Sequence, residues 1–255
     1  MKRGSVFLLA FLIVSLSLTL IHPVFAAYIF EDGFESGDFS EWNGTHTGPD
    51  STLTVETDIV KAGTYAAKGY DLEWAGDAYA YYQHSSHLSE AYCRVYFRFV
   101  SIPSSSGGFV GLIIFRDMQD YADRVRVEIR HDGTSCKWYL TDGTNTDYGG
   151  NVSTGTWYCV ELHANYSSGN HELEINGSQE CSITDGVSGE TVRYFKVGLA
   201  SRSNEGSAYE VRFDCVVVDD SYIGVISEGE EKNFYGIINP QFTINHASTW
   251  TFNRY

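Results

Sequence analysis

Short runs in which apolar and polar residues alternate recur along most of this chain, and they constrain its fold more than any other feature. Two typical runs are YCRVYFRF (residues 92–99) and YEVRFDCVVVDD (residues 209–220). A period of two places successive side chains on opposite faces of a β-strand, whereas an amphipathic helix has a period of about 3.6. No long window has the helical period, so the sequence predicts strands and turns.

The alternation also predicts which side of each strand is buried. In the first run the apolar edge is Cys93, Val95, Phe97 and Phe99, and in the second it is Val211, Phe213, Cys215 and Val217. We therefore expect Cys93 and Cys215 to be small core residues.

Turn signals separate the runs at fairly even spacing. An Asp-Gly pair, residues 132–133, lies between runs 124–130 and 136–140 and predicts a β-hairpin. Runs 157–164, 171–176 and 179–183 predict a meander. A series of roughly a dozen such strands predicts an all-β fold, a two-sheet antiparallel β-sandwich of the jelly-roll type. We place this single domain at residues 27–224.

Both ends of the chain differ from the middle. Lys2 and Arg3 precede an apolar run, residues 6–21, and a small-residue site at residues 24–26, which predicts a signal peptide over residues 1–26. The apolar run is shorter than the roughly 20 residues of a spanning helix, so we expect cleavage and an extracellular or cell-surface protein. An acidic linker, residues 225–232, leads to a β-type appendage, residues 233–255.

The charge balance excludes some partners. The chain has 17 Lys and Arg against 33 Asp and Glu, a net charge of −16 that becomes −18 when Lys2 and Arg3 are removed. Such a charge repels nucleic acid and anionic membranes.

The cysteines and sequons fit an exported chain. The five cysteines have no CxxC or His-rich metal spacing, and Cys136, Cys159 and Cys181 are candidates for one cross-strand disulfide. Four Asn-x-Ser/Thr sequons are candidate glycosylation sites, at Asn43, Asn151, Asn165 and Asn176.

Five segments carry a resemblance to a known family: DGFESGDFSEW (32–42), KAGTY (61–65), GTWYCVELH (155–163), LEING (173–177) and FDCVVVDD (213–220). They resemble the concanavalin A-like lectin/glucanase superfamily, and more narrowly laminin-G-like jelly rolls of secreted microbial proteins. The resemblance covers about residues 28–224 and implies the sandwich fold. Because one such fold carries lectins, hydrolases, lyases and adhesive modules, function has to be argued from the site.

Two enzyme interpretations can be tested against the residues. Glucanases of the superfamily carry paired carboxylates in an E-x-D-x-x-E strand, which is absent here; Glu161, Glu172 and Glu174 are more simply solvated strand residues. In the alginate-lyase branch, strands R-x-E-L-R, Q-I-H and Y-F-K-x-G-x-Y resemble residues 94–98, 112–114 and 194–200. The proton-transfer positions hold Tyr96, Ile114 and Ala200, which favours a relative without catalytic activity.

What the lyase comparison retains is a set of cationic and aromatic residues. It implies that Arg94, Tyr96, Arg98, Tyr194 and Lys196 share one concave face away from the core. Arginine forks bind carboxylate or sulfate and aromatic rings stack on sugars, so these five are our candidate ligand-binding residues for an acidic or neutral glycan. The alternative is that acidic neighbours pair with the cations and the tyrosines only cover the sheet.

The acidic ends form a second candidate site. In related jelly rolls a structural calcium ties the N-terminal loop to the last strand, and the resemblance places Asp32, Glu35 and Asp214 at ligand positions. Carboxylate oxygens suit Ca²⁺. The alternative is an ordinary Asp-Gly turn and a surface Asp.

These observations favour a secreted carbohydrate-binding or cell-surface recognition module without catalysis. The competing hypotheses are a structural or adhesive protein that assembles with itself or other surface proteins through residues 233–255, and a polysaccharide lyase or hydrolase.

Overall fold

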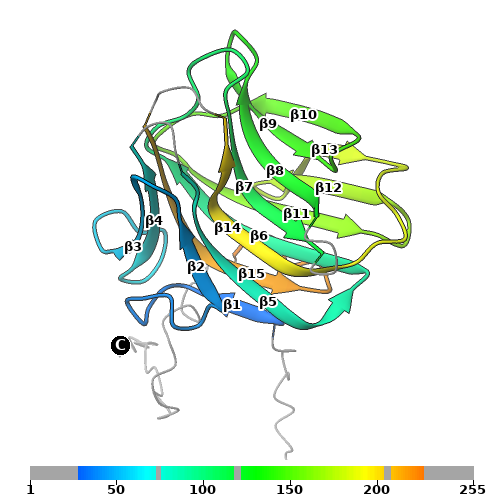
Figure 1. Cartoon of the computed structure of the whole chain (residues 1–255), viewed down its shortest axis with the longest axis horizontal. Coiled ribbons are helices and arrows are strands. Elements are labelled where there is room, and N and C mark those ends of the chain that lie inside the picture. The colour runs from blue at the N-terminus through cyan, green and yellow to red at the C-terminus, as the bar shows by residue number, and fades with distance from the viewer. Residues whose placement is uncertain (1–27, 73–75, 118–121, 204–207, 227–255) are drawn as a thin grey trace, which may run out of the picture.

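The protein, described here from a computed structural model, is a sandwich of two antiparallel sheets (Figure 1). The structure describes residues 28–72, 76–117, 122–203 and 208–226, which contain fifteen strands and no helix. No helix in these ranges is long and apolar enough to cross a membrane. The predicted signal peptide and the appendage at 233–255 lie outside the described residues.

The first sheet has eight strands in the order β13-β12-β11-β6-β15-β4-β3, with β1 also paired to β15. Its strands are β1 (Phe30–Asp32), β3 (Ser51–Glu56), β4 (Ala66–Asp71), β6 (Glu90–Phe99), β11 (Trp157–Asn165), β12 (Asn170–Ile175), β13 (Ser178–Ile183) and β15 (Tyr209–Asp219).

The second sheet has seven strands in the order β10-β9-β8-β7-β14-β5-β2. Its strands are β2 (Gly44–Thr47), β5 (Ala78–Leu88), β7 (Phe109–Arg116), β8 (Asp123–His131), β9 (Cys136–Thr141), β10 (Thr146–Asn151) and β14 (Val192–Arg202).

The predicted local pairings are present. Strands β8 and β9 form the hairpin expected around the Asp-Gly turn, and β11, β12 and β13 form the expected meander. The N-terminal strand β1 pairs with the last strand β15, with Phe30 opposite Val218 and Asp32 opposite Val216. The prediction that the acidic start and the final valine-rich strand close the same two-sheet body is therefore confirmed.

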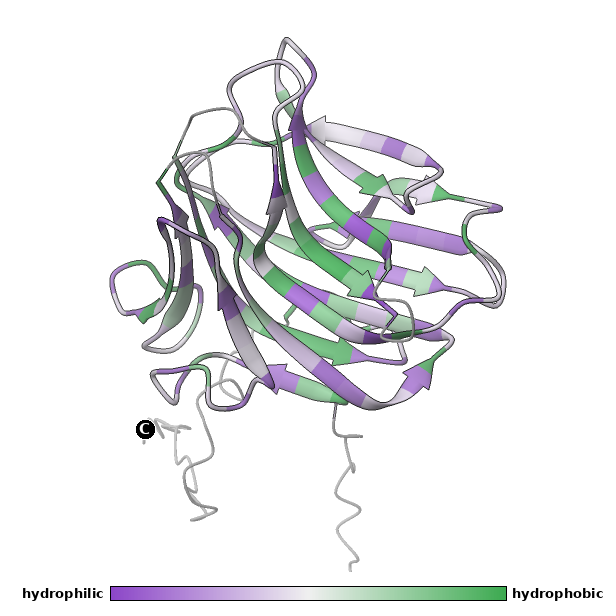
Figure 2. Cartoon of the chain, in the orientation of Figure 1, coloured by the Kyte–Doolittle hydropathy of each residue, from purple (hydrophilic) through white to green (hydrophobic). Residues whose placement is uncertain are grey.

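The core lies between the sheets and follows from the alternation of side chains. Figure 2 shows hydrophobic and hydrophilic residues alternating along strands such as β8. From β8 the core receives Val125, Val127 and Ile129, and from β6 it receives Cys93, Val95, Phe97 and Phe99 as predicted. The other residues of each strand point away from the core, and these carry the candidate sites.

The predicted apolar edge of the last strand is wrong beyond its middle. The register of β15 against β6 shifts between Asp214 and Val217, and Cys215 takes a left-handed backbone conformation with φ 52°. Such a β-bulge adds one residue and reverses the sides of those that follow. The core therefore receives Val216 and Val218, whereas Cys215 and Val217 are buried on the other side of the sheet.

The predicted disulfide is not formed. All five cysteines lie in the described ranges, where they are buried and none forms a disulfide bond. Cys136 and Cys181 contribute to the core between the sheets, whereas Cys159 lies in the cluster on the outer side of the eight-stranded sheet.

Candidate functional site

The five predicted ligand-binding residues do not share a face. Arg94, Tyr96 and Arg98 lie on β6 of the eight-stranded sheet, whereas Tyr194 and Lys196 lie on β14 of the seven-stranded sheet. Both sets point away from the core, so they lie on opposite outer surfaces of the sandwich. The prediction of one common face was wrong: it came from matching short strand motifs to those of alginate lyases, and such a match does not fix the sheet to which a strand belongs.

The three candidate residues of β6 form hydrogen bonds with backbone groups of neighbouring loop segments. Arg94 is almost completely buried, and its Nη1 donates to the carbonyl oxygen of Gly224 at 2.9 Å. The Tyr96 hydroxyl accepts a hydrogen bond from the Ile226 amide, and Arg98 Nε donates to the Gly155 carbonyl. In these contacts the two arginines donate to backbone carbonyls, whereas the alternative interpretation expected acidic side chains.

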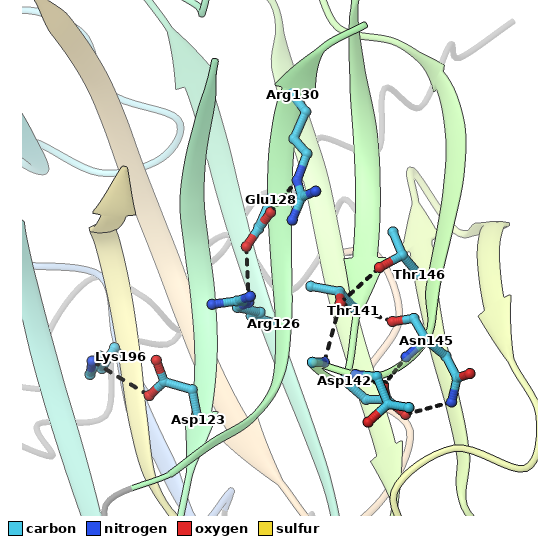
Figure 3. Close-up of polar contacts among 11 residues, drawn as sticks. Asp123, Arg126, Glu128, Arg130, Thr141, Asp142, Asn145, Thr146 and Lys196 are labelled. Carbon is cyan, nitrogen blue, oxygen red and sulfur yellow. Dashed lines mark hydrogen bonds and ion pairs between the residues drawn. The ribbon is translucent and has the colours of Figure 1, made fainter. Parts of the chain in front are cut away.

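Tyr194 and Lys196 belong to what we call the lysine cluster, which is completed by Tyr79 and Tyr81 of β5 and Asp123 of β8. The Lys196 Nζ lies 3.7 Å from Asp123 Oδ1 (Figure 3) and 5.0 Å from the ring centroid of Tyr79. The rings of Tyr81 and Tyr194 stack with centroids 4.8 Å apart. Two neighbouring strands thus place a cation and three aromatic rings on one side of the sheet, where Tyr81 and Tyr194 are partly exposed and Tyr79 and Lys196 are buried.

The sheet pairing explains why these side chains meet. Lys196 is directly opposite Tyr81 of β5 on one side and Ile114 of β7 on the other. Although Lys196 and Ile114 point away from the core, they are only 4% and 0% exposed. Neighbouring side chains therefore cover both residues, and at these two positions the outer surface is not open to solvent.

Burial controls the charges in the lysine cluster. It lowers the pKa of Lys196, while the nearby carboxylate of Asp123 opposes that change. Burial raises the pKa of Asp77, Tyr79 and Tyr194. The tyrosines are therefore neutral hydrogen-bond donors at physiological pH, and the ammonium group is held in a site that is poor in water.

A second polar group, the arginine pair, lies on β8 of the same surface and consists of Arg126 and Arg130 with Glu128 between them (Figure 3). Arg126 Nε is 2.9 Å from Glu128 Oε1, and Arg130 Nε is 2.5 Å from Oε2. The Glu128 side chain is fully buried, whereas the two arginines are 30% and 31% exposed. The sequence analysis did not identify this group, although the alternation in RVRVEIR (124–130) places Arg126, Glu128 and Arg130 on one side of a strand.

The opposite surface has a hollow of about 100 Å³, lined by Tyr92, Glu161, His163, Glu172, Glu174 and Tyr222. Its polar groups are used within the protein. Glu161 accepts hydrogen bonds from the Ile223 and Gly224 amides, and Tyr222 donates to Glu174. His163 lies against Glu90 through Nε2 at 2.8 Å. Of the three carboxylates predicted to be solvated, Glu161 is buried instead, and it positions the 221–226 segment together with Glu174. Glu172 lies beside His163.

The side chains of the three predicted calcium ligands accept hydrogen bonds, mainly from backbone amides. Asp32 accepts from the Phe34 amide and the Trp42 indole, and Glu35 accepts from the Thr64 and Tyr65 amides. Asp214 accepts from the amides of residues 61, 62 and 215. Within the described ranges no three His, Cys, Asp or Glu side chains form a group that suits a metal ion. The predicted ligand set is not assembled there, and calcium binding itself stays a prediction.

The sequon asparagines lie at strand ends and turns. Asn43, Asn151 and Asn176 are exposed and Asn165 is partly exposed. Each accepts a hydrogen bond through Oδ1. Glycosylation stays a prediction.

The fold was compared with known proteins. No protein-family model and no curated protein sequence matches the chain. Among solved structures, the cellulose-induced protein Cip1 has a TM-score of 0.60 at 18% identity, covering 77% of this chain and 99% of that chain. An endo-β-1,4-glucuronan lyase from the fungus Trichoderma reesei has a TM-score of 0.57 at 16% identity, covering 76% and 96%. A carbohydrate esterase from a Shiga toxin-encoding bacteriophage has 0.52 at 11%, covering 77% and 99%.

Identities this low show the fold alone. They confirm the predicted all-β jelly-roll sandwich, which is similar to that of several carbohydrate-active proteins.

Proposed function

We propose that this protein binds a polysaccharide on the outer surface of the seven-stranded sheet, through the lysine cluster. The observation that carries the proposal is the stacked pair Tyr81 and Tyr194 beside the shielded ammonium of Lys196. Aromatic rings pack against sugar rings, and neutral tyrosine hydroxyls and an ammonium group donate hydrogen bonds to sugar oxygens or carboxylates. Three proteins of similar fold are a cellulose-induced protein, a glucuronan lyase and a carbohydrate esterase, which supports a carbohydrate ligand.

The proposal places the protein outside the cell, after removal of residues 1–26. There its acidic surface disfavours nucleic acid and anionic membrane, so that binding to a glycan depends on this local surface.

The test is binding of the full secreted chain to soluble polysaccharides, measured by titration calorimetry. Tyr194→Ala removes one ring of the stack and Lys196→Met removes the ammonium; each is expected to weaken binding by about tenfold or more, since each loses a contact worth roughly 1–3 kcal/mol. Arg98→Gln, on the opposite surface, is the matched control and should bind as the unaltered protein does. Equal binding by all four proteins would refute the proposal.

A second candidate function is cleavage of an acidic polysaccharide by β-elimination, for which Lys196 and Tyr194 lie on the same outer side of β14. A neutral Lys196 amine would take the proton beside the uronate carboxylate. The bond to the leaving sugar oxygen would break as a carbon–carbon double bond forms, and the Tyr194 hydroxyl would donate a proton to that oxygen. The unsaturated product absorbs ultraviolet light. An absorbance increase with alginate that Lys196→Met abolishes would establish cleavage, and no increase would leave binding alone.

A further inference from the structure

The arginine pair has donor groups that the protein does not use. Arg126 and Arg130 each contact Glu128 through Nε. No described residue accepts a hydrogen bond from their Nη amino groups, and about 30% of each side chain is exposed. A guanidinium group carries five N–H donors in a planar fork, so each arginine keeps most of its donors for another acceptor.

The buried carboxylate orients both arginines, by a hydrogen bond from Arg130 Nε and by an ion pair with Arg126. Glu128 has no exposed area, and it lies between the two arginines on the same side of β8. The guanidinium group of Arg130 is also 5.4 Å from the ring centroid of Phe109 and 5.2 Å from that of Tyr139. Long side chains usually lose much conformational freedom when they bind, and here that cost is already met by the fold. Two positive charges against one negative charge leave a net positive site.

The neighbouring strands extend this surface with two aromatic residues, a partly buried Tyr139 and an exposed Tyr148. Tyr139 of β9 lies opposite Glu128, and Tyr148 of β10 lies opposite Tyr139. The Tyr148 ring is 60% exposed, with the Lys137 ammonium 5.2 Å from its centroid. Strand β10 is held from its other side, where Asp147 accepts from the Ser182 amide.

The pairing also sets the distance between this group and the lysine cluster. Lys196 of β14 lies opposite Ile114 of β7, which lies opposite Arg126 of β8. Neighbouring strands are about 4.8 Å apart, so Arg126 is roughly 10 Å from Lys196 across the sheet, and β10 is roughly 19 Å away. One sugar ring cannot contact both groups, whereas a chain of sugars that crosses the strands can.

From these observations we infer that the arginine pair is a separate subsite for the carboxylate or sulfate group of an acidic polysaccharide, whose chain crosses the sheet from the lysine cluster towards Tyr148. This inference deepens the proposed function and rests on it. It adds the ligand class, an anionic polymer, and two residues that select it. A protein with a net charge of −16 repels polyanions in general, so attraction of one requires such a local site.

The test uses three soluble polymers: alginate with carboxylates, dextran sulfate with sulfates, and uncharged dextran. Calorimetric titrations compare the full chain with Arg126→Gln, Arg130→Gln and the control Arg98→Gln, which alters an arginine on the opposite surface. We expect the first two variants to bind one acidic polymer at least about tenfold more weakly, since each loses charge-assisted hydrogen bonds. Arg98→Gln is expected to bind as the unaltered chain does. The polymer whose binding depends on the arginines identifies the anionic group.

A folding control keeps the result interpretable. Arg126→Lys keeps the positive charge but loses the planar fork, so it should fold and bind with intermediate affinity even where Arg126→Gln is unstable. Acidic-polymer binding that is unchanged in both Arg126 variants and in Arg130→Gln would overturn the subsite. If Tyr194→Ala still weakened binding in that case, the proposed function would stand without this subsite. No binding of any polymer by the unaltered chain would overturn both.

Discussion

The turn between β9 and β10 depends on Asp142, and replacing this residue tests how the structure holds the edge of the binding surface. Asp142 is 4% exposed. Its Oδ1 accepts hydrogen bonds from the Thr144 and Asn145 amides, and its Oδ2 accepts one from the Asn145 Nδ2 at 3.2 Å (Figure 3) and one from the Val187 amide at 3.0 Å. One carboxylate therefore forms the turn and fastens it to the segment that follows β13. We expect Asp142→Ala to remove four acceptor contacts together, three from backbone amides and one from the Asn145 side chain.

The magnitude follows from where the three amides lie. Thr144 and Asn145 are exposed, so their amides can bind water instead, and each lost bond costs about 0.5–1 kcal/mol. Val187 is only partly exposed, and its bond to a charged acceptor is worth about 1.5–3 kcal/mol. The expected loss in the free energy of unfolding is about 3 kcal/mol, a large share of the roughly 5–15 kcal/mol typical of a domain. Asp142→Asn retains one acceptor and should lose about half as much.

The pH dependence gives a second check. Although burial opposes it, hydrogen bonds to the carboxylate lower the pKa of Asp142 below 3.8. A folded-state pKa below the unfolded value means that the unfolded chain binds more protons in acid. The stabilisation is therefore fully present above the unfolded pKa and is lost as the pH falls through the folded one. The difference between the unaltered protein and Asp142→Asn should shrink over that acidic range.

The assay is urea unfolding followed by tryptophan fluorescence, with the slope of the transition checked for constancy. Asp132 is the matched control, because its Oδ1 also accepts from two turn amides, those of Thr134 and Ser135, but it is exposed. Asp132→Asn should cost clearly less than Asp142→Asn. If Asp142→Ala unfolded within about 1 kcal/mol of the unaltered protein, the reasoning from buried acceptors would be refuted.

Two further predictions concern the whole domain. His171 is fully buried and burial lowers its pKa below 6.5, so the free energy of unfolding should decrease as the pH falls below that value; His171→Gln should flatten this slope in urea unfolding, and an unchanged slope would contradict the assignment. Bound calcium would stabilise the folded chain by mass action, so excess chelator should lower the melting temperature if the calcium prediction is right, whereas a temperature indifferent to both calcium and chelator would contradict it.

Much of the fold could be predicted from the sequence because alternation is a local property. It identified β6, β8 and β15 as strands and gave the buried side of the first two correctly. It missed β2 and β10. Their residues, GTHT and TDYGGN, have no apolar edge, because both strands lie at the ends of the seven-stranded sheet and are largely exposed. The reversal in β15 was also hidden, since a left-handed Cys215 is not a residue type that signals a bulge.

The candidate site was predicted only in part, for a related reason. Tyr194 and Lys196 were identified, but their partners Tyr79, Tyr81 and Asp123 come from strands distant in sequence. Which strands become neighbours depends on pairing over long sequence separations, and no local pattern encodes it. For the same reason Arg94 and Arg98 of β6 were expected on the face that carries Lys196, whereas they lie on the other sheet.

The contacts of the outward-pointing arginines indicate which of the two outer surfaces of the sandwich binds a ligand. On the eight-stranded sheet, Arg94 and Arg98 donate to the backbone carbonyls of Gly224 and Gly155, so their donors stabilise loops that cover the sheet. On the seven-stranded sheet, Arg126 and Arg130 share a buried carboxylate that fixes their orientation but occupies only one nitrogen of each. A carboxylate that orients an arginine through one nitrogen stabilises the protein little more than a single ion pair does. The arrangement gains a further use when the remaining N–H groups donate to an acceptor from outside the protein. Ligand binding should therefore be sought on the seven-stranded sheet, and arginine substitutions on β6 should affect stability before they affect affinity.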